Sequence, residues 1–346
     1  MIPDANVQSF ASGADLNGSA SRGAGDGPGT PRKECPGCGE TGARTLFHGR
    51  DRLYHTTDKS FLLVECKNCR LIRLEPRPSL SELTAYYPAE YWYAPEEDTA
   101  SKIEESYRRF VLRDHVNFVM RAVANAGHTG LVVDVGCGGG LLLRMLRERG
   151  LSVLGLEKSH QAANAAWKRN HVAVVCGDLS EGPIERGTAA VVTMFHVLEH
   201  LHEPVSYLRS ARDLLMSGGR LVIQVPNASS WQFLMFGEHW NGVDVPRHLV
   251  NYRQRDLENL LEYCGFEVVR RKHFSLRDNP AGFASSIAPG LDPMARRVRK
   301  IRESSSMKLV KDMLYFGILL AALPFTLFEA ACGAGSTIMV EARKKT

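Results

Sequence analysis

The sequence predicts an α/β protein whose core is a doubly wound, mostly parallel sheet closed by an antiparallel last strand, behind a small four-cysteine ribbon. From residue 130 onward, short apolar strand candidates alternate with helix candidates, the pattern of a parallel sheet covered on both faces. A glycine-rich turn follows the first of these strands, and two C-x2-C pairs precede all of them. The length of 346 residues accommodates one such core together with a small second domain.

Composition shifts divide the chain into six segments. We expect a disordered tail, a cysteine ribbon, a linker with an aromatic segment and a helix, a cofactor-binding core, a basic and apolar insertion, and a final core strand; their ranges are 1–32, 33–75, 76–125, 126–274, 275–333 and 334–346. The tail is rich in Gly, Ser, Ala and Asp and has almost no large apolar residue. It therefore buries too little surface to offset the entropy of ordering.

The ribbon carries its four cysteines as two knuckles, Cys35 with Cys38 and Cys66 with Cys69, separated by 27 residues. This spacing is typical of a tetrahedral, all-thiolate structural zinc site. The alternative is a pair of reduced turns without metal. Residues 1–30 lack the apolar stretch of a secretory signal, so we expect reduced cysteines and a cytoplasmic protein.

The linker and the core supply the regular elements that we expect. A charged helix is predicted over 101–125. Core strands are predicted at 131–135, 153–156, 172–175, 190–195, 220–225, 267–271 and 337–341. Core helices are predicted at 141–149, 161–170, 205–215 and 256–264. Most of the strands are continuous apolar runs, as strands buried on both faces require.

The turn after the first core strand, Asp134 to Gly140, has glycine at 136, 138 and 140. Glycines there allow a tight turn and a close approach of the backbone to a ligand, which lies outside the carboxyl ends of the strands. The dinucleotide fingerprint G-x-G-x-x-G is not met, because Leu141 and Leu143 stand where a third glycine is needed. This spacing disfavours a nicotinamide or flavin cofactor. Glu157 closes the second strand, where a carboxylate accepts hydrogen bonds from ribose hydroxyls.

In combination, these motifs resemble those of the class I S-adenosylmethionine (SAM)-dependent methyltransferases, in the branch that includes the ubiquinone-type enzymes. The matching segments follow in order: Asp134–Gly140, Glu157, Gly177–Leu179, His196–Leu201, Gly218–Gly219, Pro226–Asn227 and Trp240–Leu249. The cysteine pairs and the Pro-x-Pro-Ser-x-x-Glu-Leu-x-x-Tyr-Tyr segment after them are similar to a zinc-ribbon module fused to some of these enzymes. The resemblance therefore implies a Rossmann-like methyltransferase sheet.

The resemblance also implies roles for single residues. SAM would be bound by Asp134, Gly136, Cys137, Gly138, Gly140, Glu157, Asp178, Leu179, Phe195 and His196. Asp134 would lie near the methionine part, Glu157 at the ribose and Asp178 at the adenine amino group. Phe195 and His196 would lie at the end of the fourth strand, beside the transferred methyl group.

Three histidines are candidates for managing the proton of the methyl acceptor: His196, His200 and His248. Imidazole suits this task because it titrates near neutral pH. Some ubiquinone-type members have Glu-x-x-Glu-His here and are thought to use a divalent cation. His196 replaces the first glutamate, so we expect no second divalent cation. The aromatic segment 231–240 is a candidate wall of the acceptor site, with ordinary core packing as the alternative.

The insertion combines charge with an apolar run. Residues 296–312 carry seven basic and two acidic side chains, which account for the whole net charge of +5. The rest of the chain is thus neutral overall, and we expect no nucleic-acid partner. The uncharged run 313–328 is 16 residues long and contains Pro324. This is short of the ~17–25 residues of a spanning helix, so we expect an interfacial helix on a membrane or a cap over the active site, with peripheral membrane contact through 296–328.

Together these observations predict SN2 methyl transfer from SAM to an oxygen or carbon nucleophile of a small-molecule, sugar or lipid-linked acceptor. Two alternatives belong to other classes. The first is a non-catalytic scaffold that uses the ribbon for protein contacts, and it is disfavoured because every cofactor position holds a suitable residue. The second is an NAD(P)-dependent oxidoreductase, which the missing third glycine disfavours.

Overall fold

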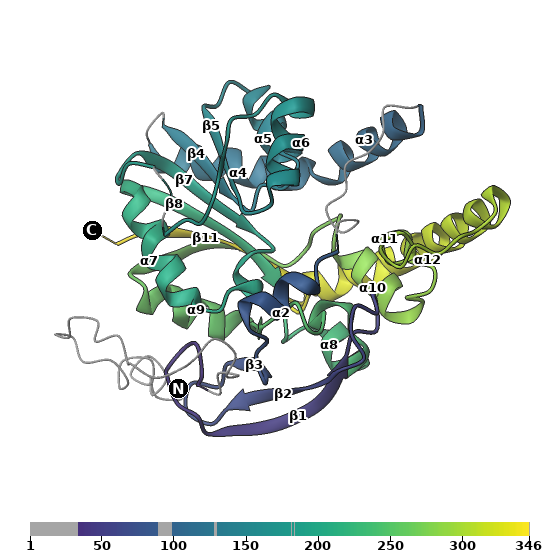
Figure 1. Cartoon of the computed structure of the whole chain (residues 1–346). Coiled ribbons are helices and arrows are strands. Elements are labelled where there is room, and N and C mark those ends of the chain that lie inside the picture. The colour runs from purple at the N-terminus through teal and green to yellow at the C-terminus, as the bar shows by residue number, and fades with distance from the viewer. Residues whose placement is uncertain (1–33, 89–98, 128–129, 181, 183, 346) are drawn as a thin grey trace.

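The computed structural model describes residues 34–88, 99–127, 130–180, 182 and 184–345. The expected tail, 1–32, lies outside the described residues, and so does the second half of the aromatic segment of the linker. The described chain forms a large sheet with helices on both faces and a smaller antiparallel sheet beside it (Figure 1).

The large sheet has seven strands in the order β10-β11-β8-β7-β4-β5-β6. The strands are β4 (Leu131–Val135), β5 (Val153–Glu157), β6 (Val174–Cys176), β7 (Ala189–Phe195), β8 (Leu215–Pro226), β10 (Phe266–Lys272) and β11 (Thr337–Lys344). Neighbours among β4 to β8 run parallel, whereas β11 is antiparallel to both β8 and β10. The predicted fold class, including the antiparallel last strand, is confirmed.

Successive side chains along the strands point to opposite faces of the sheet and pack in two separate cores. Val132 and Val191 pack with helices on one face, and Val133 and Val192 belong to the core of the other. The first face is covered by α4 (Arg113–Ala126), α5 (Leu141–Arg147) and α6 (His160–Asn170), the second by α7 (Pro204–Leu214) and α9 (Gln254–Tyr263), as Figure 1 shows. The carboxyl ends of β4 to β7 are thereby left for a ligand site.

The ribbon forms a four-stranded antiparallel sheet in the order β1-β2-β3-β9. Its strands are β1 (Ala43–Arg50), β2 (Ser60–Cys66), β3 (Ile72–Glu75) and β9 (Val250–Asn251). Strand β9 belongs to the core segment of the chain, where it begins two residues after the predicted site residue His248. The ribbon sheet is therefore completed by the active-site side of the core, a pairing that the sequence did not predict.

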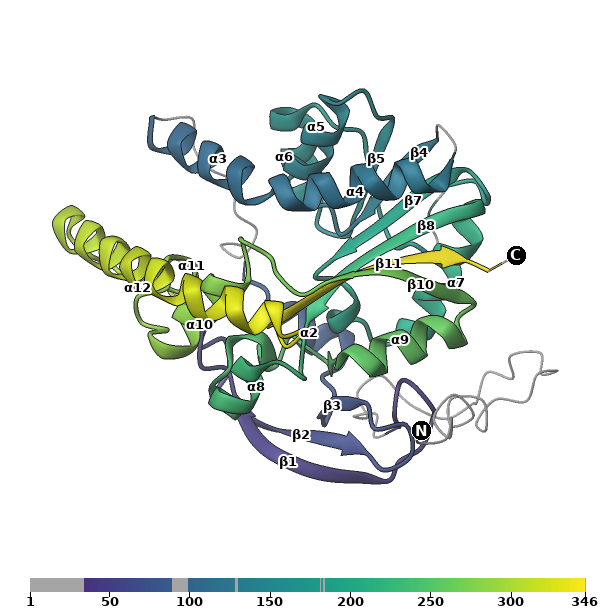
Figure 2. The ribbon, with the colours of Figure 1, turned by 180° about the vertical axis from the view of Figure 1, so that it is seen from behind.

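The linker forms α2 (Leu80–Ala85), α3 (Thr99–Val111) and α4. The prediction of a single helix over 101–125 was wrong, because the chain turns at Leu112, whose ψ of −5° departs from helical geometry. As a result α4 packs on the sheet, whereas α3 projects from the molecule (Figure 2).

The insertion forms α10 (Asn279–Ile287), α11 (Pro293–Val298) and α12 (Ser305–Ala331). The expected interruption at Pro324 was wrong, because the uncharged run 313–328 lies within one longer helix. The helix continues through Pro324 and begins already at Ser305, so it includes Lys308, Lys311 and Asp312 and has 27 residues. By length and composition α12 could cross a membrane, and only 22% of its most apolar stretch is buried. It projects from the same end of the molecule as α3 (Figure 2).

Candidate active site

The glycine turn joins β4 to α5 at the carboxyl edge of the sheet. Gly136, Gly138 and Gly140 have φ of 71°, 52° and 74°, a region that favours glycine. A Cβ on Gly136 would lie 2.6 Å from the Val197 side chain, so close packing also requires glycine there. At Gly138 no atom lies within 4 Å of an added Cβ. The turn is thus tight toward the protein and open on the side where a ligand would bind.

Glu157 links the end of β5 to this turn. Its Oε2 accepts the Gly138 N–H at 2.9 Å and its Oε1 accepts the Ser159 N–H at 2.8 Å. The carboxylate is buried against the protein and held by both bonds. Its remaining lone pairs suit ribose hydroxyls beside the open face of the turn.

Asp134 lies next to the turn and is buried, with its Oδ1 accepting the Thr193 hydroxyl at 2.5 Å. Burial raises the pKa of Asp134 to about 7, against the lowering effect of the Thr193 bond. A cationic ligand nearby would favour the ionised form. Asp134 is therefore suited to the positive charges of a SAM molecule.

Asp178 follows β6 and accepts hydrogen bonds from Ser180 and from Lys158 Nζ, the latter at 2.6 Å. Leu179 beside it is buried, as expected for a residue that packs against a ring. Cys137 and Phe195 lie at the ends of β4 and β7. The structure thus brings all the predicted cofactor-binding residues to the carboxyl ends of four adjacent parallel strands.

His196 follows Phe195 with a left-handed φ of 56°, which turns its ring between two carboxylates. Its Nδ1 lies 3.1 Å from Glu199 Oε1 and its Nε2 lies 3.6 Å from Asp278 Oδ2. Although burial opposes the charge on the ring, the carboxylates of Asp278 and Glu199 raise the pKa of His196 to about 9. Gln224 donates to Asp278 Oδ2 at 2.6 Å, and the same amide nitrogen lies 2.8 Å from Nε2 of His196. His196 is thus suited to hold a proton rather than to accept one transiently.

His200 and His248 have a different surrounding. The Nδ1 of His200 lies 3.0 Å from the carbonyl oxygen of Arg247, and the Nδ1 of His248 lies 2.8 Å from the carbonyl oxygen of Gly242. A carbonyl oxygen only accepts, so these contacts place a proton on the Nδ1 of each ring. Burial, together with the His248 ring, lowers the pKa of His200 to about 4. His200 is therefore neutral at physiological pH.

Ligand atoms of Glu199, His200 and His248 lie within 4.8 Å of one another. Glu199 Oε2 is buried without a hydrogen-bond partner among the described residues. Geometrically these three side chains could hold a divalent cation. The expectation that no second cation is used rests on His196 in place of glutamate, and it stays a prediction.

A cavity of about 320 Å³ adjoins the histidines. Three parts of the chain line it: the ribbon, the core loops and the insertion. The lining includes Leu53, Tyr54, His196, His200, Trp240, His248, Arg277, Asp278, Ser285, Met294 and Tyr315. Its size lies at the lower end of small-molecule sites. Of the expected aromatic wall, Trp240 lines this cavity, whereas Trp231 packs against Phe325 and Phe328 of α12.

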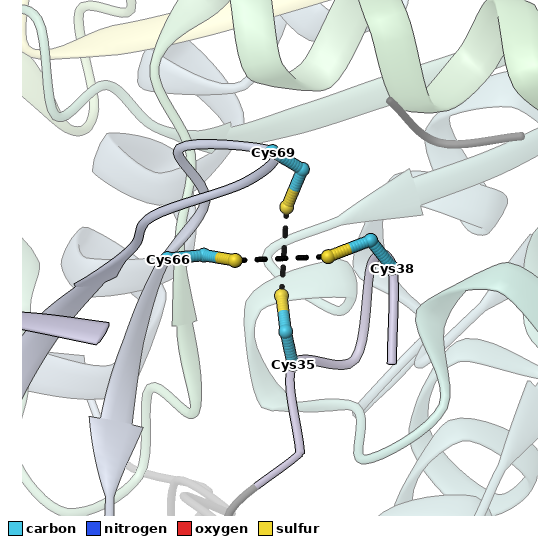
Figure 3. Close-up of side chains that lie close together, drawn as sticks. All are labelled: Cys35, Cys38, Cys66 and Cys69. Atoms are coloured by element: carbon cyan, nitrogen blue, oxygen red, sulfur yellow. Dashed lines mark hydrogen bonds between the residues drawn. The ribbon is translucent and has the colours of Figure 1, made fainter. Parts of the chain in front are cut away.

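The four ribbon cysteines point their sulfur atoms at one common point (Figure 3). The Sγ atoms of Cys35 and Cys69 are 3.5 Å apart, and those of Cys38 and Cys66 are 3.6 Å apart. Thiolates around a tetrahedral zinc ion, with Zn–S bonds near 2.3 Å, would lie about 3.8 Å apart. All four are buried, and this donor set fits zinc.

Several of these residues were not assigned to the site from the sequence. Asp278 precedes α10 in the insertion, where no motif marks it, and Gln224 lies within an ordinary buried strand. Tyr87 of the linker lies with its hydroxyl 2.8 Å from His200 Nδ1. Only the folded topology brings these side chains to the histidines.

The carboxyl-edge turn, the Glu157 carboxylate and the acidic residue after β6 define an α/β protein that binds a nucleoside-containing cofactor. A family model described as a methyltransferase domain matches residues 106–271. The ubiquinone biosynthesis O-methyltransferase of Marinobacter nauticus is 30% identical over 167 residues, which are 44% of this chain and 69% of the relative. That of Citrobacter koseri is 28% identical over 172 residues, 46% of this chain and 71% of the relative.

Among solved structures, magnesium protoporphyrin IX methyltransferase from Synechocystis PCC 6803 with bound SAH is 15% identical with a TM-score of 0.44. That match covers 73% of this chain and 91% of the other. On the sequence matches, the chain belongs to the class I SAM-dependent methyltransferase family and is an enzyme of that class. The alternatives of a scaffold and of a nicotinamide oxidoreductase are thereby set aside.

Proposed function

We propose that this enzyme methylates a hydroxyl oxygen of a lipid-linked acceptor with a polar, sugar-like head group, and that His200 is the base. The observation that carries the proposal is that His200, whose Nδ1 faces the Arg247 carbonyl oxygen, lines a cavity that is also lined by Tyr315 of α12. Two relatives named as O-methyltransferases favour oxygen over carbon as the nucleophile.

The cofactor is assigned to the residues at the carboxyl edge. Asp134, Gly136, Cys137, Gly138, Gly140, Glu157, Asp178, Leu179, Phe195 and His196 would hold it. When bound, SAM supplies a methyl group on a sulfonium, which an acceptor oxygen takes while the sulfur keeps the bonding electrons. The protein's task is then mainly to orient the acceptor, which is worth up to roughly 7–11 kcal/mol.

His200 removes the acceptor proton in this proposal. Its ring is neutral at physiological pH and its Nδ1–H is directed to Arg247, so Nε2 is the atom that takes the proton. His196 has the higher proton affinity, and the two carboxylates that face its ring nitrogens hold the ring in place at the cavity wall. His248 lines the same cavity beside His200, and the centroids of the two rings are 4.6 Å apart.

The acceptor class follows from the lining of the cavity. Near the histidines the walls are polar, with Asn241, Asp244 and Arg277 among them, which suits a hydroxyl-rich head group such as a sugar. The insertion helices contribute Met294 and Tyr315 to the lining, next to the polar Ser285 and Asp292. An apolar tail would leave the cavity toward α12.

Helix α12 is the element that such a tail would contact. It exposes an apolar surface made by Met307, Leu309, Val310, Met313, Leu314, Phe316, Leu320, Leu327 and Phe328. The basic stretch before it is partly neutralised, because Arg296 pairs with Glu303 and Asp312. Arg299, Arg302 and Lys308 remain exposed beside the apolar surface. This combination supports binding of α12 to an anionic bilayer, and we propose a peripheral enzyme at the cytoplasmic face of a membrane.

We assign the cysteine cluster to a structural zinc ion. Four thiolates leave no open coordination position for a substrate. The ion would hold the two knuckles together and thereby fix β2 and β3 beside the core.

The test combines cofactor binding with methyl transfer. Calorimetric titration with S-adenosylhomocysteine should show micromolar binding that the Asp134→Ala, Glu157→Ala double variant loses. Incubation with methyl-labelled SAM and a lipid extract of bacterial membranes should label a lipid, and His200→Gln should lose this labelling while still binding S-adenosylhomocysteine. Labelling confined to water-soluble compounds would overturn the acceptor class, and undiminished transfer by His200→Gln would overturn the base.

A further inference from the structure

The ribbon contacts the loop that carries Arg247 and His248 through a buried ion pair. Asp51, just after β1, has a fully buried side chain, and so does Arg247 of the core. Arg247 Nη1 donates to Asp51 Oδ2 at 3.1 Å, and Nη2 donates to Oδ1 at 2.9 Å. This two-pronged geometry fixes the orientation of the guanidinium as well as its position.

Asp51 is itself immobilised by its own loop. It accepts the backbone N–H groups of Tyr54 and Thr56 at 3.0 and 2.8 Å and the Thr56 hydroxyl at 2.5 Å. The Arg247 guanidinium also stacks 4.4 Å from the centre of the Tyr54 ring. Arg247 is held on its other side by Asp244 at 2.7 Å. The arginine is therefore clamped between a ribbon carboxylate and a core carboxylate.

The backbone of Arg247 also contacts His200, the proposed base. The carbonyl oxygen of Arg247 accepts from Nδ1 of His200 at 3.0 Å, while the Tyr87 hydroxyl lies 2.8 Å from the same nitrogen. The two neighbours differ in what they require, because a carbonyl oxygen only accepts whereas a hydroxyl can donate or accept. The carbonyl requires a proton on Nδ1, whereas a hydroxyl donating to Nδ1 would leave the proton on Nε2. The position of the Arg247 carbonyl thus decides whether Nε2 has a lone pair.

We propose that Asp51 is a positioning residue for His200: by clamping Arg247, the ribbon keeps the Arg247 carbonyl against Nδ1 and selects the tautomer with a basic Nε2. The inference rests on the proposed role of His200. It makes the ribbon part of the catalytic centre, in keeping with the pairing of β9, which begins two residues after His248, with the ribbon strand β3. A base held in the wrong tautomer loses up to ~10⁴-fold in rate in a well-studied triad.

The test reads the tautomer directly, in the full, zinc-loaded chain. Long-range ¹H–¹⁵N correlation spectra of histidine-labelled protein should show His200, assigned through His200→Gln, protonated on Nδ1. In Asp51→Asn the signal should move toward the Nε2-protonated form. In the Asp51→Asn, Tyr87→Phe double variant it should return toward Nδ1, because the competing hydroxyl is gone.

Activity and control variants complete the experiment. With labelled SAM and the bacterial lipid extract, Asp51→Asn should transfer methyl groups about 10²- to 10⁴-fold more slowly, with unchanged affinity for S-adenosylhomocysteine. The control is Arg253→Gln, which breaks another ion pair between core and ribbon, to Glu65 at 2.7 Å, and should change neither reading. If Asp51→Asn does not fold, Arg247→Lys replaces it, since lysine keeps the charge but cannot form the fork.

The outcomes separate this inference from the proposed function. An unchanged His200 tautomer in a folded Asp51→Asn protein overturns the positioning role. Full transfer by His200→Gln overturns the proposed base instead, whatever the spectra of Asp51→Asn show.

Discussion

Nε2 of His196 lies 3.6 Å from Oδ2 of Asp278, although one residue ends a core strand and the other belongs to the insertion before α10. Despite the burial of its carboxyl, Arg277 and His196 hold the pKa of Asp278 well below its usual range. The pair is thus charged on both sides near neutral pH. It couples the segment that carries α12 to the end of β7, beside the cofactor site.

The first prediction follows from this pair. In Asp278→Asn the pKa of His196, which is about 9 in the native protein, should fall by about 1–3 pH units, because one of its two carboxylate partners is lost. The titration of the His196 ring by NMR measures this. Asp213→Asn, which removes a carboxylate paired with the exposed Arg186, should leave the ring unchanged.

The same pair has a defined effect on stability. The folded pKa of His196 exceeds the unfolded value of 6.5, so its contribution to the free energy of unfolding is complete below about pH 6.5. It should be lost as the pH rises through about 9. Urea unfolding of the native protein and of Asp278→Asn should therefore differ more at pH 6 than at pH 10. Equal differences at both pH values would contradict the assignment.

The second prediction concerns the cysteine cluster. The purified chain should bind one zinc ion, and Cys66→Ser should lose it. Comparable sites contribute about 10–16 kcal/mol to folding, so chelation should melt the ribbon sheet. Because β9 pairs with β3, the signals of His200 and His248 should change as well. The control is Cys332→Ser, at an exposed cysteine outside the cluster, whose zinc content should equal that of the native chain.

The third prediction tests the glycine turn. Gly136→Ala should weaken S-adenosylhomocysteine binding at least tenfold, because the new Cβ would lie 2.6 Å from Val197 and the turn must shift. Gly187→Ala is the matched control. Its φ is also 71°, but no atom lies within 4 Å of the added Cβ. Calorimetry on both variants separates the steric effect on the site from the general cost of alanine in this conformation; equal affinities would refute the packing argument.

The order of the core elements was predictable because parallel strands that are buried on both faces consist of apolar residues. In the sequence, these apolar runs alternate with the amphipathic patterns of the helices. Boundaries agreed to within a residue or two for β4 and α6, for example. The helix over 101–125 was misjudged because periodicity does not show the turn at Leu112. The length of α12 was misjudged because charge was taken as the end of the helix, whereas Ser304 caps it and Lys308, Lys311 and Asp312 lie within it.

The site was predictable where a motif lies at a strand end and unpredictable where the tertiary fold supplies the partner. Glu157 and the glycine turn could be placed because adjacent parallel strands end at one edge. The neighbours that set the proton affinities of the histidines could not. Asp278 comes from the insertion and Asp51 from the ribbon, and both are brought in by long-range packing that no local pattern encodes.

The last prediction concerns the exposed surface of α12. The native protein should sediment with vesicles of phosphatidylethanolamine and phosphatidylglycerol, and less with phosphatidylcholine alone, since the exposed cations beside the helix favour anionic lipid by roughly 1 kcal/mol each. Leu314→Asp should weaken binding about tenfold or more, because an apolar side chain that is 55% exposed would be replaced by a charge.

The matched control is Leu80→Asp, which places the same charge on a leucine of α2 that is 70% exposed. It should bind vesicles as the native protein does. If both substitutions weaken binding equally, the attraction is a general effect of net charge. If neither does, α12 does not bind the bilayer, and the acceptor must reach the cavity from solution.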